Sequence, residues 1–278
     1  MPIMDVNSWL KQAKTQIDAL DAELIAVCNF APNGRDRSWL VAHGERKVAG
    51  ESLSRANQMM EKRRKGMPLA YVLGYREFYG RKFMVNRHVL IPRPETETLV
   101  DLIKELELPR RPQFLEIGTG SGCIAITLAL EFPQAYVMAT DISVTALDMA
   151  YENDVLHEGR VEFMQSNLLR DLVIDPHAAE FDVLVANLPY VNPEWNWLDR
   201  RTLDFEPKTA LYAKGEGGIS MYRRLFREIM MKRKVDGILK VKYIVIEADP
   251  CQHEALRKCA EEFGLLVVKM RGFGLVLV

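Results

Sequence analysis

The sequence has few cysteines and no spacing that would let them work together. Only four of the 278 residues are cysteine, at positions 28, 123, 251 and 259. No two of them form a Cys-x-x-Cys pair and no histidine cluster accompanies them, which disfavours both a zinc site and a disulfide framework. Thiols in a chain without a disulfide framework are typical of a reducing compartment, so we expect the protein to be cytoplasmic.

The sequence also lacks long apolar runs and an excess of charge of one sign. No apolar run reaches the roughly 18 residues that span a bilayer. Residues 1–14 show no basic region followed by an apolar stretch, so we expect no signal peptide. The formal net charge is -1, which argues against a protein that binds nucleic acid through bulk electrostatics. We therefore expect no membrane association and no stable nucleic-acid partner. We also expect a monomer.

What is present is a mixture of helical and strand patterns in three parts. Residues 1–68 have helical periodicity over 9–30, 38–43 and 51–65. Residues 69–93 are rich in strand formers with glycines between them, which predicts a β-hairpin linker. Residues 94–278 begin with a helix over 97–106 and then alternate strands and helices. This alternation predicts an α/β domain of the Rossmann-like kind, a mostly parallel sheet with an antiparallel last strand.

A glycine-rich turn joins the first strand of this third part to a helix. The run from Phe114 to Gly122 reads Phe-Leu-Glu-Ile-Gly-Thr-Gly-Ser-Gly. Glycines permit backbone conformations that other residues avoid, and they let a ligand approach the chain closely. The helix that follows offers unpaired N–H groups to a polar ligand. The pattern indicates a cofactor site at the end of the strand.

Two cofactor classes compete for this turn, and a purely structural turn is the third possibility. A dinucleotide site needs Gly-x-Gly-x-x-Gly, whereas this chain has Cys123 at the last position. Glu116 would repel a pyrophosphate but can neutralise an amino group or a sulfonium, which favours S-adenosylmethionine. Asp141, at the end of the next strand, can accept from both ribose hydroxyls, and Asn167 can accept from the adenine amine. The predicted cofactor residues are Glu116, Gly118, Thr119, Gly120, Gly122, Asp141, Ile142, Asn167 and Asn187.

A second constellation, Asn187-Leu188-Pro189-Tyr190, directly follows the strand over 181–186. Asn187 brings a side-chain carbonyl, Leu188 a backbone carbonyl, Pro189 a stiff turn and Tyr190 a flat face. Two acceptors and a flat ring suit a planar group that ends in NH₂, such as a carboxamide or an aminopurine. Accepting both hydrogens orients the nitrogen and raises its electron density in the transition state. We therefore predict that these four residues are catalytic.

At this point the chain resembles the release factor glutamine N5-methyltransferase family over nearly its whole length. The resemblance is carried by residues 66–74, the hairpin with Glu77-Phe78-Tyr79-Gly80, the segment from Leu90 to Glu97 (Leu-Ile-Pro-Arg-Pro-Glu-Thr-Glu), Glu116 to Gly122, Asn187 to Tyr190, and Phe205-Glu206-Pro207. It implies methyl transfer from S-adenosylmethionine to the glutamine of the Gly-Gly-Gln loop in class I peptide-chain release factors. It also implies that the helical part, residues 1–68, helps to hold the release factor and that 94–278 is the methyltransferase domain.

Two site positions differ from the residues usual in that family, and two other functions stay open. Leu188 replaces a proline and Asn167 an aspartate. An adenine-N6 methyltransferase on RNA or DNA would share the NH₂ geometry, but it needs a basic surface. A protein that binds cofactor or release factor without turnover is the other alternative. The candidates for a basic surface are the runs at 62–65, 200–201, 223–224 and 232–234.

Overall fold

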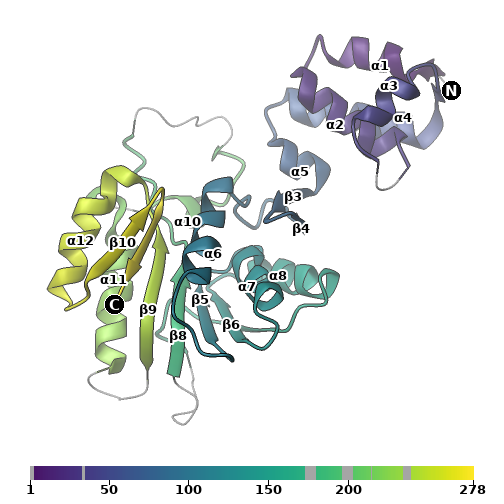
Figure 1. Cartoon of the computed structure of the whole chain (residues 1–278). Coiled ribbons are helices and arrows are strands. Elements are labelled where there is room, and N and C mark those ends of the chain that lie inside the picture. Colours follow the sequence, from purple (N-terminus) through teal and green to yellow (C-terminus); the bar gives the residue numbers. More distant parts are fainter. Residues whose placement is uncertain (1–2, 33–34, 173–179, 196–202, 214, 234–238) are drawn as a thin grey trace. The chain divides into compact units, whose positions relative to one another are not determined.

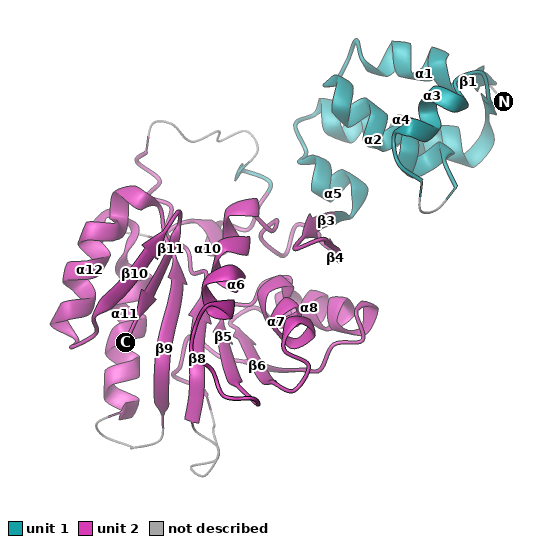
Figure 2. Cartoon of the chain, in the orientation of Figure 1, with its two compact units in different colours: residues 1–75, 199–205 teal, residues 76–198, 206–278 magenta. Residues whose placement is uncertain are grey.

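The computed structural model describes residues 3–32, 35–172, 180–195, 203–213, 215–233 and 239–278 (Figure 1). Three basic residues named above, Arg200, Arg201 and Lys234, lie outside the described residues. The chain forms two compact units, residues 1–75 with 199–205 and residues 76–198 with 206–278 (Figure 2). Within the described part of the chain, no helix combines the length and apolarity that a bilayer crossing needs.

The first unit is a helical bundle with a two-stranded sheet that the sequence analysis did not anticipate. Its elements are β1 (Met4–Asp5), α1 (Val6–Ala13), α2 (Ala19–Phe30), α3 (Ser38–Ala42), β2 (Lys47–Val48), α4 (Gly50–Arg64) and α5 (Leu69–Leu73). The periodicity over 9–30 does not form one helix, because α1 ends at Ala13. The Asp18 carboxylate then accepts from the N–H of Leu20 at 2.8 Å, which begins α2.

The expectation of a strand at the start of residues 69–93 was wrong. Residues Leu69–Leu73 form helix α5, which ends at Gly74 in the left-handed region with a φ of 83°. Val72 is buried in the apolar core of the first unit, so packing outweighs the strand preference of this β-branched residue. The following residues do form a two-stranded sheet, β3 (Tyr75–Phe78) with β4 (Arg81–Met84).

The second unit is built on a seven-stranded sheet in the order β10-β11-β9-β8-β5-β6-β7. Strands β5 (Gln113–Ile117), β6 (Tyr136–Asp141), β7 (Val161–Gln165), β8 (Glu180–Ala186) and β9 (Lys240–Glu247) are parallel. β10 (Val267–Arg271) and β11 (Gly274–Leu277) are antiparallel to each other, and β11 is antiparallel to β9. The structure confirms the predicted mostly parallel sheet with an antiparallel last strand.

Helices lie on both faces of this sheet (Figure 1), and alternate residues of a strand point to opposite faces. Phe114 packs with α6 (Glu97–Lys104) and α7 (Cys123–Glu131), and α8 (Val144–Leu156) lies against α7. Leu115 and Ile117 belong to the opposite core, which includes residues of α11 (Ser220–Met231) and α12 (His253–Glu262). Shorter helical segments are η1 (Pro94–Thr96), α10 (Lys208–Leu211), η2 (Glu216–Gly218) and η4 (Pro250–Gln252).

The strand order creates a switch point between β5 and β8. From β5 the chain builds outward through β6 and β7, and it then returns to place β8 on the other side of β5. Ligands of open α/β sheets bind at the carboxyl ends of strands at such a point. Ile117 and Ala186 are register partners there, so the turn after Ile117 and the segment from Asn187 begin side by side.

Candidate active site

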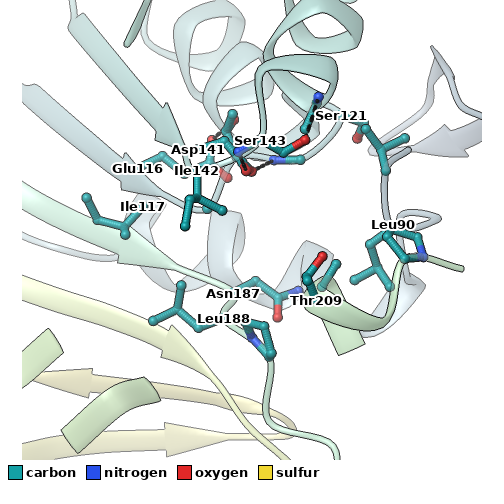
Figure 3. A pocket seen from close by; sticks show the side chains of 18 of the residues that line it. Leu90, Glu116, Ile117, Ser121, Asp141, Ile142, Ser143, Asn187, Leu188 and Thr209 are labelled. Carbon is teal, nitrogen blue, oxygen red and sulfur yellow. Dashed lines mark hydrogen bonds between the residues drawn. The ribbon is translucent and has the colours of Figure 1, made fainter. Parts of the chain in front are cut away.

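A cavity of about 350 Å³ opens at the carboxyl ends of β5, β6 and β8 (Figure 3). One side, here named the glycine-turn wall, is formed by residues within 116–124, 141–146 and 166–168. The other side, the loop wall, is formed by residues within 87–96, 187–189 and 207–210, together with Met221. In Figure 3, Glu116, Asp141 and Ile142 lie across the cavity from Asn187 and Leu188.

Glu116 is the buried acid of the glycine-turn wall, with 1% of its surface exposed. Its Oε2 accepts from the hydroxyl of Thr119 at 2.6 Å and from the N–H of Ala125 at 3.0 Å. Burial raises the pKa of Glu116 to about 7, and the nearby Asp141 adds to the rise, although both hydrogen bonds oppose it. A cationic group bound in the cavity would favour the ionised form.

Asp141 ends β6 and is held by two backbone donors. Its Oδ2 accepts from Gly120 N at 2.9 Å and its Oδ1 from Ser143 N at 2.9 Å. Burial raises the pKa of this carboxyl while these bonds lower it. A carboxylate has about four lone-pair sites, so each oxygen retains capacity to accept from a ligand hydroxyl. Ile142 beside it is 57% exposed and also lines the cavity, as does Asn167.

The three glycines of the turn have different surroundings. All have positive φ, with 79° at Gly118, 57° at Gly120 and 80° at Gly122. A Cβ on Gly118 would lie 3.1 Å from Leu188 Cδ2, which shows how closely the two walls approach. A Cβ on Gly122 would lie 3.1 Å from the Cβ of Ala150, in α8. Gly118, Thr119 and Gly120 line the cavity, whereas Gly122 does not, so Gly122 serves helix packing here.

Asn187 lies at the start of the loop wall and is anchored from a distant part of the sequence. Its Nδ2 donates to Thr96 Oγ1 at 3.1 Å. Leu188 and Pro189 also line the cavity. The N–H of Leu188 donates to the hydroxyl of Tyr222 at 3.1 Å, and that hydroxyl in turn donates to the backbone carbonyl of Glu247. The loop after β8 is thereby tied to the end of β9.

Tyr190 is not among the residues that line the cavity. Its hydroxyl donates to Glu247 Oε1 at 3.0 Å, and burial together with Glu247 raises its pKa. The sequence analysis placed Tyr190 beside the substrate as a flat face. The structure instead places its polar end on the buried acid behind the loop.

An ion pair joins two segments of the loop wall. Arg93 Nη2 lies 2.5 Å from Glu206 Oε1, and Glu206 Oε2 accepts from the N–H of Ile91 at 3.1 Å. The Glu206 side chain is fully buried, whereas Arg93 is 31% exposed. The pair joins the 90–96 segment to the 206–210 segment, and both segments supply lining residues.

Sequence reasoning missed several lining residues and one supporting residue. The missed lining residues include Arg87, His88, Leu90, Thr96, Ser143, Thr209 and Met221. The missed supporting residue is Glu247, although a signal for it existed. Like Asp141, Glu247 is the last residue of a buried parallel strand, and Glu116 is the last but one of its strand. Acids at such positions lie at the ligand edge of the sheet, which is the signal that pointed to Glu247.

Comparison with known proteins agrees with this geometry. Residues 96–238 match the family model described as the methyltransferase small domain, and residues 5–74 match the PrmC N-terminal domain. A release factor glutamine methyltransferase from Koribacter versatilis (strain Ellin345) is 41% identical over 253 residues, which cover 89% of this chain and 86% of that protein. The chain belongs to the release factor glutamine methyltransferase family. It is thus an enzyme of the methyltransferase class.

Further relatives extend this likeness. The release factor glutamine methyltransferase of Aliivibrio fischeri (strain ATCC 700601 / ES114) is 33% identical over 236 residues, covering 84% of this chain and 80% of that one. Among solved structures, the hMettl16 catalytic domain bound to a MAT2A 3'UTR hairpin superimposes with a TM-score of 0.52. That match covers 88% of this chain and 92% of the other at 16% identity, so it shows the shared fold alone.

Proposed function

We propose that this member of the release factor glutamine methyltransferase family transfers a methyl group from S-adenosylmethionine to the side-chain N5 of glutamine in the Gly-Gly-Gln loop of class I peptide-chain release factors. The observation that carries the proposal is the pairing of two walls across one cavity. One wall presents the acids Glu116 and Asp141, and the other presents the Asn187 loop. The relatives supply the substrate by their names.

The glycine-turn wall fits S-adenosylmethionine by the chemistry of its donors and acceptors. When bound, this cofactor supplies an electrophilic methyl group on a sulfonium. Glu116 would hold a cationic group, Asp141 would accept from ribose hydroxyls, and Asn167 would accept from the adenine amine. Gly118, Thr119 and Gly120 let the cofactor lie against the backbone, and Ile142 offers apolar surface. A cavity of about 350 Å³ is within the usual range for such ligands.

The loop wall suits the glutamine amide. Asn187 Oδ1 and the carbonyl of Leu188 would accept the two hydrogens of the substrate NH₂, and Pro189 would limit the loop's freedom. These bonds orient the nitrogen and stabilise the positive charge that develops on it during transfer. Alignment of the nitrogen with the methyl carbon supplies much of the remaining acceleration, up to roughly 7–11 kcal/mol for well-oriented pairs. The proton leaves after transfer, so no strong base is required.

We further propose that the helical residues 1–68 contact the release factor, that the part of 69–93 after helix α5 acts as a linker, and that 94–278 perform the chemistry in the cytoplasm. A monomer suffices for this activity, because both walls of the cavity come from one chain. No RNA or DNA partner is needed for the proposed reaction.

The adenine-N6 alternative has little support from the described basic residues. Arg64 and Lys65 pair with Glu61, and Arg63 pairs with Asp21. Arg223 and Arg224 likewise pair with acids, Glu262 and Glu228. Cations that are already neutralised attract phosphates less strongly.

One paired experiment tests the proposal. Purified protein, S-adenosylmethionine and a class I release factor are incubated, and the tryptic peptide containing Gly-Gly-Gln is weighed by mass spectrometry. We expect a single added methyl on the glutamine, together with cofactor binding in isothermal titration. Binding without methylation would instead favour the non-catalytic alternative. Methylation of an adenine oligonucleotide in place of the peptide would favour the nucleic-acid alternative.

A further inference from the structure

A buried acid lies behind the loop wall, outside the cavity. Glu247 ends β9 with 1% of its surface exposed, and it is not among the lining residues. Its Oε1 accepts from the hydroxyl of Tyr190. Its Oε2 is buried and has no hydrogen bond of normal geometry within the described ranges. Burying a polar atom without a hydrogen-bond partner costs free energy of folding, so the groups close to this oxygen matter.

The side chains of Thr96 and Asn187 lie near the Glu247 carboxyl group. Thr96, at the end of η1, is 2% exposed, and its Oγ1 accepts from Asn187 Nδ2. Burial raises the pKa of the Glu247 carboxyl, and the nearby charge of Glu95 adds to this. The side chains of Thr96, Tyr190 and Asn187 lie close enough to lower that pKa again. Burial is the largest of these influences, so the pKa of Glu247 is raised overall.

The donor and acceptor rules then fix the direction of the contacts. The Glu247 oxygen that lacks a partner can accept, and a threonine hydroxyl has one proton to donate. If Thr96 donates that proton to Glu247, its oxygen can only accept from Asn187. Of the two ends of the Asn187 amide, only Nδ2 can donate. The amide must therefore turn Nδ2 toward Thr96, which leaves Oδ1 on the opposite side of the amide.

We propose that Thr96 and Glu247 are positioning residues that hold the Asn187 amide with its oxygen toward the substrate. The inference rests on the proposed function, since a reversed amide would present Nδ2 to the substrate NH₂, donor against donor. Thr96 supplies the hydroxyl that distinguishes the two orientations. Glu247 supplies the acceptor oxygen toward which the Thr96 proton points.

The test compares two substitutions at Thr96 with one matched control. Thr96→Val keeps the shape and removes the hydroxyl, whereas Thr96→Ser keeps the hydroxyl. Thr127→Val removes another buried hydroxyl, in α7, that has no hydrogen-bond partner in the described structure and does not line the cavity. Methyl transfer to purified release factor gives kcat and KM, and isothermal titration gives the Kd for S-adenosylmethionine.

We expect Thr96→Val to lower kcat by about 5- to 150-fold, the loss that follows from one misplaced buried hydrogen bond. The KM for release factor and the Kd for S-adenosylmethionine should change far less. Thr96→Ser should recover most of the lost kcat, and Thr127→Val should turn over like the parent protein. Equal losses in Thr96→Val and Thr127→Val, or full activity in Thr96→Val, would overturn the inference.

A substitution at Glu247 tests the role of the second proposed positioning residue. Glu247→Gln can donate to Thr96 as well as accept, so the direction of the contacts is no longer fixed. We expect kcat to fall while the Kd for S-adenosylmethionine is kept. If Thr96→Val fails to fold, this variant decides the matter, and parental kcat in it would overturn the inference.

A spectroscopic measurement separates this inference from the proposed function. The side-chain NH₂ signals of Asn187, identified in a ¹⁵N spectrum by their loss in Asn187→Asp, require no turnover. We expect them to move in Thr96→Val and to stay in place in Thr127→Val. If the parent protein methylates nothing but these signals behave so, the proposed substrate is wrong and the positioning role stands. If it methylates release factor and the signals do not move, only the positioning role fails.

Discussion

The two walls of the cavity hold their polar groups by different means. On the glycine-turn wall, Glu116 and Asp141 accept from the backbone N–H groups of Ala125, Gly120 and Ser143, and only the adjacent Thr119 adds a side-chain donor, to Glu116. On the loop wall, Asn187 is held by the side chain of a residue from a distant segment, Thr96. A wall fixed by backbone groups depends mainly on the path of the chain. A wall fixed by side chains should respond strongly to single substitutions.

The largest expected effect is the loss of unfolding free energy when the ion pair of the loop wall is broken. Arg93→Ala would leave the fully buried Glu206 charge without its partner, and breaking a buried pair in this way typically costs about 3 kcal/mol or more of unfolding free energy. Arg81→Ala is the matched control, because Arg81 is 29% exposed and its partner Glu131 keeps Lys104 at 2.6 Å. Denaturant unfolding of both variants measures the difference. Equal losses of unfolding free energy in the two variants would contradict the expected difference between the buried Glu206 and the partly exposed Glu131.

The next effect concerns the buried acid of the glycine-turn wall. The pKa of Glu116 is raised from 4.5 to about 7, so between these values the folded chain binds more protons than the unfolded chain. The unfolding free energy of the ligand-free protein should therefore fall as pH rises through this window, by up to about 3 kcal/mol from this group. Glu116→Gln should remove that part of the slope, as measured by denaturant unfolding at several pH values.

A matched substitution should act with the opposite sign. Lys104 and Arg81 lower the pKa of Glu131, so its contribution is present above its unfolded pKa and is lost as the solution becomes more acidic. Glu131→Gln should thus flatten the acid end of the profile. If both variants flatten the same range, the assignment of the neutral-pH slope to Glu116 is wrong.

Asn187→Ala sharpens the comparison at the level of catalysis. Loss of one buried hydrogen-bond partner costs about 1–3 kcal/mol, so turnover should fall about 5- to 150-fold with cofactor binding largely kept. Asp141→Asn on the opposite wall should act chiefly on the Kd for S-adenosylmethionine. Steady-state kinetics of the two variants measure kcat, and isothermal titration measures the Kd for S-adenosylmethionine. An unchanged kcat in Asn187→Ala would remove Asn187 from the mechanism.

The smallest effect is expected from Leu188→Pro, which restores the residue usual in the family. It removes the N–H that donates to Tyr222, which lowers the unfolding free energy by about 1 kcal/mol. Proline also reduces the conformational entropy of the unfolded chain, which raises the unfolding free energy by about 0.4–1 kcal/mol. The net change in unfolding free energy should lie below about 1 kcal/mol. Tyr222→Phe should cost more, about 1–3 kcal/mol, since it leaves the buried Leu188 N–H without an acceptor. Thermal unfolding of both variants ranks them.

The sequence predicted the glycine-turn wall better than the loop wall, for a physical reason. Glu116, Asp141 and Asn187 lie at or next to the carboxyl end of a strand, and strand ends of a parallel sheet meet at one edge. Their gathering around one cavity therefore follows from the alternation of strands and helices. The support of Asn187 by Thr96 depends on how a separate segment packs, which no local pattern encodes.

Local preferences also failed where tertiary packing outweighs them. Val72 favours a strand but lies in helix α5, buried in the core of the first unit. Gly122 belongs to the glycine pattern, yet its missing side chain makes room for Ala150 rather than for the cavity. Tyr190 follows the acceptor residues in sequence, but its hydroxyl is drawn to Glu247. In each case a contact remote in sequence decides the outcome.

The close approach of Gly118 to Leu188 has a consequence for how the reaction distance is set. A Cβ at position 118 would lie only 3.1 Å from Leu188 Cδ2, and Gly118 has a positive φ that other residues rarely adopt. A larger residue there would be strained and would press on the Leu188 side chain. In the proposed reaction, glycine at this position would let the cofactor and the substrate amide approach each other closely.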